Sequence, residues 1–369
     1  MKTYHKWIIG LVALVVIIGL IVINKKQSPV SSETIKIGAA LALTGDAAEW
    51  GEQSLNGAKL AVSEINAKGG INGKQLELIV EDTKSTSKDS VSAVSKLQNV
   101  DGARALLVSW LDVYQGAESV LKDDAYIISP DSGIEAVNGE TVKPRVYSTW
   151  YRTGPKSELA VKHMAENGVK TLYLIAENDS YYTGALNFMK VAAAKYGVEI
   201  VGTDQPTSAD SLKSIMIKVK DKSPDAVFFA FYDEAKNYEF LSKRKSFLGD
   251  SVKVYSDEFT RQNYQNETFP KGSFDGIYFY SPQSPEKKFG ELYKATYNSD
   301  PVFGASTAYD AVYMIAEVSK KTPENIDAFM RSTTFDTASY GKVIFDAIGG
   351  VQSKENYFEI KQVVDGKIK

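Results

Sequence analysis

The sequence predicts an α/β protein with two doubly wound, Rossmann-like lobes, each built around a mostly parallel sheet. In residues 35–82 a strand-like run, an amphipathic helix and a second strand-like run follow one another. Such a βαβ unit joins parallel strands, which a tight hairpin cannot connect. Strand and helix patterns then alternate to residue 129 and again from 171 to 256. The Gly- and Pro-bearing segment 138–155 separates the two series and indicates a boundary between lobes.

The first series follows the periodicities of strands and of helices that lie on a sheet. After Gly51, the residues Leu55, Ala58, Val62 and Ile65 form one apolar stripe, which is typical of such a helix. The elements expected here are strands at 35–43, 75–81, 103–109 and 125–129, and helices after residue 51, near 88–100 and near 113–122.

The second series starts after a strand-like run at 145–149. Its apolar run 226–231 suits a strand that is buried on both faces of a sheet. The elements expected here are strands at 171–176, 199–203, 226–231, 253–256, 274–280, 341–345 and 357–364, and helices at 183–196, 208–221, 234–247, 286–297, 305–321 and 324–332.

Composition excludes several classes of function. The 369 residues carry 43 Lys and Arg against 46 Asp and Glu, so no basic surface for nucleic acid is expected. The absence of Cys excludes thiolate metal sites and cysteine nucleophiles, and two His are too few for a histidine-rich metal site. Carboxylate-only Mg²⁺ or Ca²⁺ binding stays open, although EF-hand spacing does not occur. Residues 69–74 lack the Walker pattern and 38–45 lack G-x-G-x-x-G, so no cofactor is expected.

The sequence offers no catalytic constellation. It contains no G-x-S-x-G elbow, and a Ser-His-Asp triad would need His163, whose neighbours place it on an ordinary amphipathic helix. Adjacent acids such as Asp123-Asp124 are not thereby placed across a scissile bond. We therefore predict a protein that is not an enzyme.

The N-terminal segment 1–34 predicts a membrane anchor and a linker. Residues 7–23 are all apolar or Gly, a length at which a helix begins to span a bilayer. Because secretory cores are shorter and only Val30-Ser31-Ser32 offers a weak cleavage site, we favour an uncleaved anchor over a signal peptide. The body is expected at the extracytoplasmic face of the membrane, or as a secreted or periplasmic protein if the segment is cleaved.

Candidate ligand-binding residues come directly after predicted strands. Since the carboxyl ends of parallel strands meet at one edge, such residues can converge. The alternative for each aromatic ring is packing, as for Trp50 over the start of its helix, and for each acid the capping of a helix. The candidates by this reasoning are Trp50, Ser109, Trp110, Asp131, Ser132, Tyr182, Tyr232 and Glu258.

Short motifs along the chain carry a family resemblance. These motifs are Leu43-Thr44-Gly45, Trp50-Gly51, Asn56-Gly57-Ala58, residues 65–73, Glu81-Asp82, Ile128-Ser129-Pro130, residues 179–182 and Tyr309-Asp310-Ala311. With them, residues 35–365 resemble the branched-chain amino acid (Leu/Ile/Val) binding proteins, the substrate-binding components of ABC importers with the type I periplasmic binding protein fold.

The resemblance implies two lobes joined by a hinge of three crossings, with the ligand closed between them. Lobe 1 would take residues 35–151 plus 282–338, and lobe 2 would take 152–281 plus 339–369. Family ligand positions correspond to Trp50, Tyr182 and Tyr232, and Glu258 resembles the carboxylate that holds the ligand's ammonium group. An ABC permease is the expected partner of a monomeric soluble body.

Two loops depart from the family's pattern. Where small hydroxyl residues usually meet the ligand carboxylate, this chain has Trp110 and Asp112 after Ser109, and it has Asp131 before Ser132 in the next loop. Asp131 would repel a ligand carboxylate if it faces the cleft, whereas it would be harmless as a cap of the following helix. If it faces the cleft, we expect an amide or polyamine-like ligand, with Trp50 and Trp110 stacked on it.

The function predicted is capture of a small polar ligand, an amino acid or a related amide or amine, and its delivery to an ABC importer. An extracellular sensing domain that signals to a separate membrane partner is the alternative. Neighbouring permease genes would favour import, and a neighbouring kinase gene would favour sensing.

Overall fold

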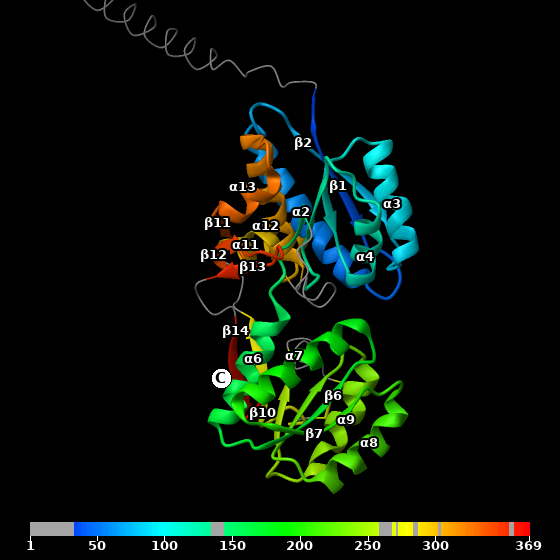
Figure 1. Cartoon of the computed structure of the whole chain (residues 1–369), viewed down its shortest axis with the longest axis vertical. Coiled ribbons are helices and arrows are strands. Elements are labelled where there is room, and N and C mark those ends of the chain that lie inside the picture. Colours follow the sequence, from blue (N-terminus) through cyan, green and yellow to red (C-terminus); the bar gives the residue numbers. More distant parts are fainter. Residues whose placement is uncertain are drawn as a thin grey trace, which may run out of the picture.

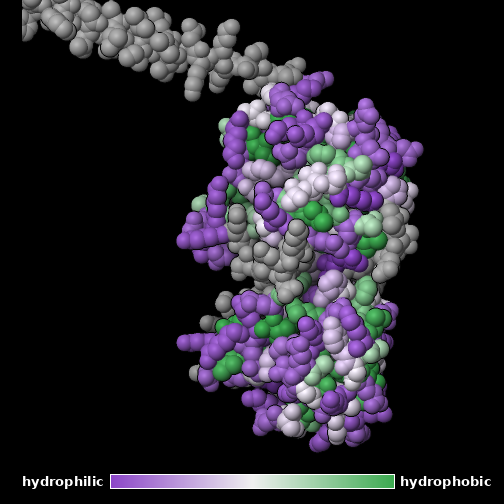
Figure 2. All heavy atoms as spheres, turned by 60° about the vertical axis from the view of Figure 1, so that its left-hand side comes forward, coloured by the Kyte–Doolittle hydropathy of each residue, from purple (hydrophilic) through white to green (hydrophobic). Residues whose placement is uncertain are grey.

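Two α/β lobes lie one above the other in the computed structural model (Figure 1), which describes residues 33–133, 144–257, 268–270, 272–282, 287–301, 304–353 and 358–369. A narrow waist separates the lobes, and hydrophobic patches lie on the lower lobe just below it (Figure 2). Within the described ranges, no helix is both long and apolar enough to cross a membrane. The anchor predicted at 7–23 lies outside them.

The upper lobe is built on a parallel sheet of five strands in the order β2-β1-β3-β4-β5. The chain runs outward from β1 to one side and then returns to the other, so β1 and β3 flank the topological switch point. The elements are β1 (Ile35–Leu41), α2 (Ala48–Ala67), β2 (Leu76–Asp82), α3 (Ser87–Asn99), β3 (Ala105–Val108), α4 (Leu111–Ser119), β4 (Tyr126–Ser129) and β5 (Val146–Ser148).

The lower lobe is built on a seven-stranded sheet in the order β15-β14-β10-β9-β8-β6-β7. Strands β6 to β10 are parallel, whereas β14 runs antiparallel to β10 and β15 antiparallel to β14. The elements are α6 (Thr153–Glu166), β6 (Thr171–Ala176), α7 (Ser180–Tyr196), β7 (Glu199–Asp204), α8 (Ala209–Lys222), β8 (Ala226–Ala230), α9 (Glu234–Leu248), β9 (Lys253–Ser256), β10 (Ile277–Pro282), β14 (Phe358–Val364) and β15 (Lys367–Ile368). The predicted fold class of two α/β lobes is thereby confirmed.

A segment late in the chain returns to the upper lobe. Its helices α11, α12 and α13 and a small antiparallel sheet β11-β12-β13 appear in orange and red in Figure 1. The elements are α11 (Lys287–Tyr297), α12 (Ala305–Lys321), α13 (Ile326–Ser332), β11 (Phe335–Thr337), β12 (Gly341–Phe345) and β13 (Val351–Ser353).

Two sequence-based boundaries differ from the structure. The second lobe was expected to resume at residue 339, but β12 and β13 pair with β11, and only β14 and β15 join the lower sheet. Strand pairing therefore keeps residues 341–345 and 351–353 in the small sheet with β11. Helix α2 begins at Ala48 and not after Gly51, because the turn at Gly45 (φ +86°) already ends the loop. Trp50 consequently lies in the first turn of a helix.

Helix α2 packs tightly against α12 because Gly57 lies at their contact. A Cβ added at Gly57 would lie 1.9 Å from the carbonyl oxygen of Ala305. Real Cβ atoms do not approach a backbone atom so closely, so any side chain here would push the two helices apart. The close contact at Gly57 therefore fixes α2, which carries Trp50, against α12.

We predict that Gly57→Ala lowers the free energy of unfolding by about 1–3 kcal/mol, as overpacking does. Gly290→Ala is the matched control, because Gly290 is also helical and a Cβ there meets no atom within 4 Å. That variant should be neutral or gain about 0.5–1 kcal/mol from the better helix propensity of Ala. Urea unfolding checks both, and equal midpoints for the two variants would contradict the packing argument.

Candidate functional site

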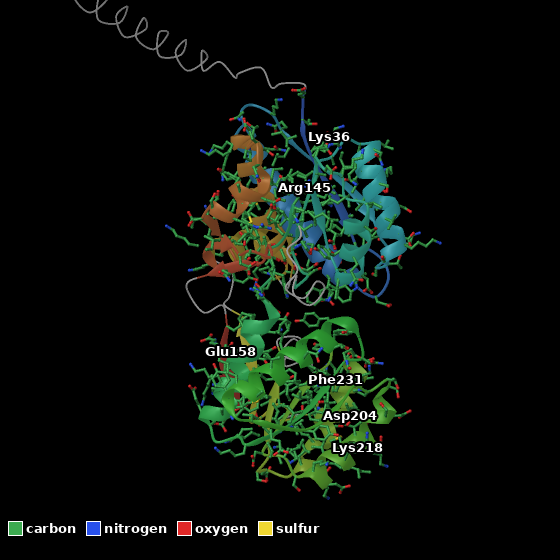
Figure 3. The ribbon with its side chains drawn as sticks, in the orientation of Figure 1. Lys36, Arg145, Glu158, Asp204, Lys218 and Phe231 are labelled. Atoms are coloured by element: carbon green, nitrogen blue, oxygen red, sulfur yellow. The ribbon has the colours of Figure 1, made fainter. Side chains whose placement is uncertain are left out.

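The candidate site is formed by loops at the carboxyl ends of the strands in both lobes. In Figure 3, Lys36 in β1 lies at the top of the upper lobe, and Phe231, directly after β8, lies near the top of the lower lobe. Strand β1 therefore runs down toward the lower lobe, and β8 runs up toward the upper one. Burial raises the pKa of Asp179, which precedes α7 in the lower lobe, to about 6, and the carboxylate of Asp112, in α4 of the upper lobe, makes a smaller contribution across the gap between the lobes. The two loop edges thus face each other.

Three tryptophans cluster on the upper lobe's side. The ring centroid of Trp50 lies 6.1 Å from that of Trp110 and 6.0 Å from that of Trp150. Trp50 and Trp110 are partly buried, whereas Trp150, in the first crossing, is 3% exposed. The packing expected for Trp50 is therefore present, and the partly open rings of Trp50 and Trp110 leave apolar surface for a ligand.

The carboxylate of Asp131 is held between α2 and the start of α4. Its Oδ1 accepts the backbone N–H of Trp110 at 2.7 Å, and its Oδ2 accepts the hydroxyl of Ser54 at 3.1 Å. Burial raises the pKa of Asp131 to about 6, although hydrogen bonds from Trp110, Ser54 and Ser132 oppose this shift. The expected alternative, capping of the following helix, concerns residues 134–143, which lie outside the described part. The bonds that the structure shows join Asp131 to the loop after β3.

Trp110 has an unusual backbone conformation, with φ +76° and ψ 140°. A bulky residue rarely adopts positive φ, and such a conformation costs about 1–3 kcal/mol. Asp131 accepts the N–H of Trp110, and the ring of Trp50 lies beside the Trp110 ring, so both contacts help to hold the strained loop. Local strain of this kind is concentrated at functional sites, which favours this loop as part of one.

Two tyrosines and a buried acid form the lower lobe's side. The hydroxyl of Tyr182 donates to Asp257 at 2.5 Å, and both side chains are 1% exposed. Burial and the neighbouring Asp257 raise the pKa of Tyr182 well above its ordinary value. The ring of Tyr232 lies 5.6 Å from that of Tyr182 and is 44% exposed. Tyr182 is therefore a fixed support, and Tyr232 the accessible ring.

A buried ion pair lies at the same edge of the lower sheet. Glu177 follows β6 directly, its Oε1 binds Nζ of Lys236 in the first turn of α9, and both side chains are 8% exposed. The pair joins the loops after β6 and β8, which flank the switch point of the lower sheet. A buried pair is costly to break, because the remaining charge is left without its partner.

The remaining predicted site residues have mixed positions. Ser109 and Ser132 are buried at 0% and 3% exposure, and both lie close to the Asp131 carboxylate. Glu258 lies outside the described residues. Sequence reasoning missed Ser54 and Trp150 as members of the site. Ser54 stands one helical turn after Trp50, a signal that a helical reading of residues 48–54 could have found.

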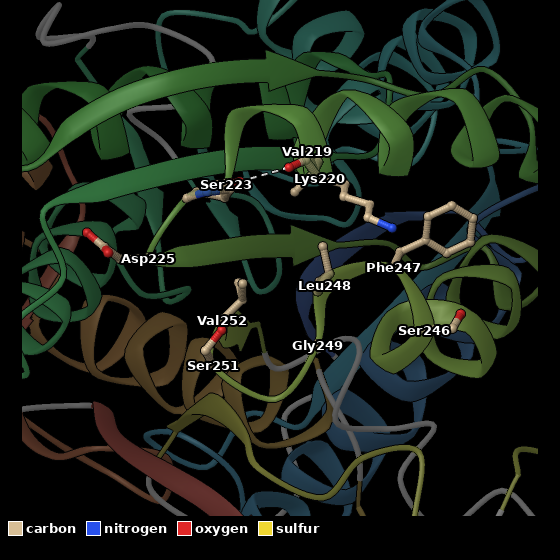
Figure 4. A pocket seen from close by; sticks show the side chains of 11 residues that line it. Val219, Lys220, Ser223, Asp225, Ser246, Phe247, Leu248, Gly249, Ser251 and Val252 are labelled. Atoms are coloured by element: carbon tan, nitrogen blue, oxygen red, sulfur yellow. Dashed lines mark hydrogen bonds between the residues drawn. The ribbon is translucent and has the colours of Figure 1, made fainter.

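A separate surface pocket lies far from this edge. It has a volume of about 500 Å³ and lies among the ends of α8 and α9 and the residues that precede β8 and β9, such as Asp225 and Val252 (Figure 4). These residues are at the amino ends of the strands, the opposite edge from the candidate site, and none of the predicted site residues lines the pocket.

A two-lobed α/β protein whose aromatic and carboxylate side chains gather at facing strand ends has the architecture of a solute receptor. The chain belongs to the periplasmic binding protein family, whose model matches residues 34–363. The resemblance seen in the sequence is thereby confirmed.

Individual relatives match the chain at low sequence identity. A leucine-, isoleucine-, valine-, threonine-, and alanine-binding protein of Pseudomonas aeruginosa is 25% identical over 341 residues, 88% of each chain. A Leu/Ile/Val-binding protein of Rhizobium johnstonii is 28% identical over 215 residues, 56% of each chain.

Solved structures show the shared fold. A branched-chain amino acid transporter substrate binding protein of Streptococcus pneumoniae, solved with isoleucine, has a TM-score of 0.73 at 23% identity and covers 91% of this chain and 98% of its own. A solute binding protein of R. palustris in complex with benzoate has a TM-score of 0.74 at 17% identity and covers 91% of this chain and 95% of its own.

We predict that Lys236→Met lowers the free energy of unfolding by about 3–5 kcal/mol, because it leaves Glu177 charged and buried. The double variant Glu177→Gln/Lys236→Met should recover most of this loss. Lys218→Met is the control, since Lys218 and its partner Asp204, both labelled in Figure 3, form an exposed pair at 2.8 Å. The control should cost less than about 1 kcal/mol. Denaturant unfolding decides, and equal losses for the two single variants would contradict the assignment.

A second prediction concerns the pH dependence of stability. The folded pKa of Asp131, about 6, lies above its reference value of 3.8, so ionising this group destabilises the folded state. The destabilisation is complete at pH 7.5 and disappears below pH 3.8, where the group is protonated in both states. We expect Asp131→Asn to raise the melting temperature at pH 7.5 by a few degrees and the gain to shrink toward pH 4.5. Asp221→Asn, at an exposed position on α8, should show no such trend. A gain that is constant with pH would contradict the assignment.

Proposed function

We propose that the protein captures a small polar solute between its two lobes and delivers it to an ABC importer. The observation that carries the proposal is the set of partly open aromatic rings and fixed carboxylates on facing strand ends of both lobes. The names of the relatives support it, since they bind leucine, isoleucine and valine. The ligand we propose is an amino acid or a related amide or amine. By the family resemblance, Glu258 would hold its ammonium group.

The proposed closure bends the chain where it crosses between the lobes. In the first crossing, Tyr151 packs its ring edge-on against Phe358 at 4.4 Å, and Phe358 begins β14 after the third crossing. Arg152 binds Asp346 at 2.7 Å, which ties the first crossing to the loop between β12 and β13. These contacts support a division into lobe 1, residues 35–151 plus about 282–353, and lobe 2, the remainder, with aligned crossings that can act together as a hinge.

We further propose that the body works outside the cytoplasm, attached to the membrane by residues 7–23. The family name and the apolar run in the sequence support this location. The role is binding without chemical conversion, as expected for a receptor of this family.

The test is to identify and then titrate the captured solute. Mass spectrometry of small molecules released from denatured protein should give a ligand, and adding it back should raise the free energy of unfolding by about 2.7 kcal/mol at a hundred times its dissociation constant. X-ray scattering should show a smaller radius of gyration on binding. Released molecules that neither stabilise nor compact the protein would contradict the proposal.

We predict that Trp50→Ala weakens binding of that solute by at least tenfold, because the ring is an open part of the upper lobe's side. Tyr232→Ala should have a similar effect on the lower lobe's side, whereas Tyr238→Ala, which removes an exposed ring on α9 that does not adjoin Tyr182, serves as the control. Isothermal titration provides the affinities. Unchanged binding in both site variants would remove these rings from the site.

A further inference from the structure

The surroundings of Asp131 show what kind of group its carboxylate can accept. Its hydrogen-bond partners are the backbone N–H of Trp110 and the hydroxyls of Ser54 and Ser132, all of them neutral donors. Among the residues that the structure describes, no Lys or Arg forms an ion pair with it. The three hydrogen bonds occupy three of the four acceptor positions of a carboxylate, which leaves one position on Oδ2 for a further donor.

The same carboxylate is bonded to the backbone of Trp110 and to Ser54, which stands one helical turn after Trp50. Trp50 and Ser54 are one helical turn apart on the same face of α2, and Ser54 binds Oδ2 of Asp131. Trp110 contributes its N–H to Oδ1 and its ring to the contact with Trp50. A carboxylate with adjacent aromatic faces attracts cations through both its charge and the ring quadrupoles.

The charge of Asp131 adds to this preference. A ligand carboxylate placed beside Asp131 would meet a like charge, whereas an ammonium or amidinium group would be attracted. Asp112, in the first turn of α4, is exposed, so water screens its charge.

We propose that the upper lobe's half of the site, formed by Trp50, Trp110 and Asp131, accepts a positively charged or N–H-donating end of the ligand and rejects a carboxylate. The inference rests on the proposed function, since it assigns the ligand class of that same site. The ligand class is an amine, amidine or amide that presents no carboxylate to the upper lobe. A plain zwitterionic amino acid oriented with its carboxylate toward Asp131 is excluded.

The test uses L-leucine and L-leucinamide, in which a carboxamide replaces the carboxylate of leucine. Agmatine and putrescine serve as cationic probes. Isothermal titration of the full chain should show leucinamide or a cationic probe binding at least tenfold more tightly than leucine. Asp131→Asn keeps an acceptor for the Trp110 N–H and should reduce that preference at least tenfold. Asp221→Asn, far from the site on α8, should leave it unchanged.

Each other outcome overturns the inference. Leucine binding as tightly as leucinamide and as every cationic probe would refute it, and so would a preference that survives Asp131→Asn. Circular dichroism of the variant confirms folding, and Asp131→Ser offers a second, smaller variant if the first does not fold. Tight leucine binding with closure would leave solute capture intact and refute only the cationic assignment. Absence of binding for every probe also contradicts the inference, whereas solute capture itself is tested by whether the released molecules stabilise and compact the protein.

Discussion

The structure depends on one geometric constraint, the common direction of parallel strands within each sheet. In both lobes the chain reverses its order at a switch point, between β1 and β3 above and between β6 and β8 below, so the loops beside these points diverge and leave room for side chains. Ser109 follows β3 and Glu177 follows β6, and neither needs a special local motif to reach the site. The strands fix where these residues lie, and the loops determine only their chemistry.

Helix α2 links this site to the stability of the whole upper lobe. Trp50 and Ser54 lie in its first two turns at the site, and Gly57 follows within the next turn at the tight contact with α12. Since α12 comes about 250 residues later in the chain, the position of the rings depends on correct packing of a distant segment. A loss of packing at Gly57 would therefore be felt as poor placement of Trp50 as well as lower stability.

Periodicity predicted most of the elements, since a buried strand such as β8 or an amphipathic helix such as α12 has a local signature. The positions that sequence reasoning could not settle depend on contacts between distant residues. Asp131 illustrates this, because nothing near it in the chain indicates that its carboxylate accepts the N–H of Trp110, 21 residues earlier. The sequence reading places Trp50 in a loop that ends at Gly51. In the structure Gly51 lies inside helix α2, where only glycine fits because the helix packs directly against the carbonyl group of Ala42.

The two sides of the candidate site differ in how fully their polar groups are already paired. On the lower side, Tyr182 with Asp257 and Glu177 with Lys236 are buried and already paired, so we expect that side to be preorganised for the proposed ligand. On the upper side, Trp110 has a strained backbone, and the partly buried Asp131, whose pKa is raised, can still accept a hydrogen bond. A hydrogen bond or ion pair from the ligand to Asp131 would favour the proposed closed state if it forms more strongly there, because a ligand shifts a two-state equilibrium only through its different affinity for the two states. The ring centroid of Trp50 lies 6.0 Å from that of Trp150, and the centroid of Trp150 lies 4.3 Å from that of Tyr151 in the first crossing, so ring packing links the proposed ligand contact to the proposed hinge.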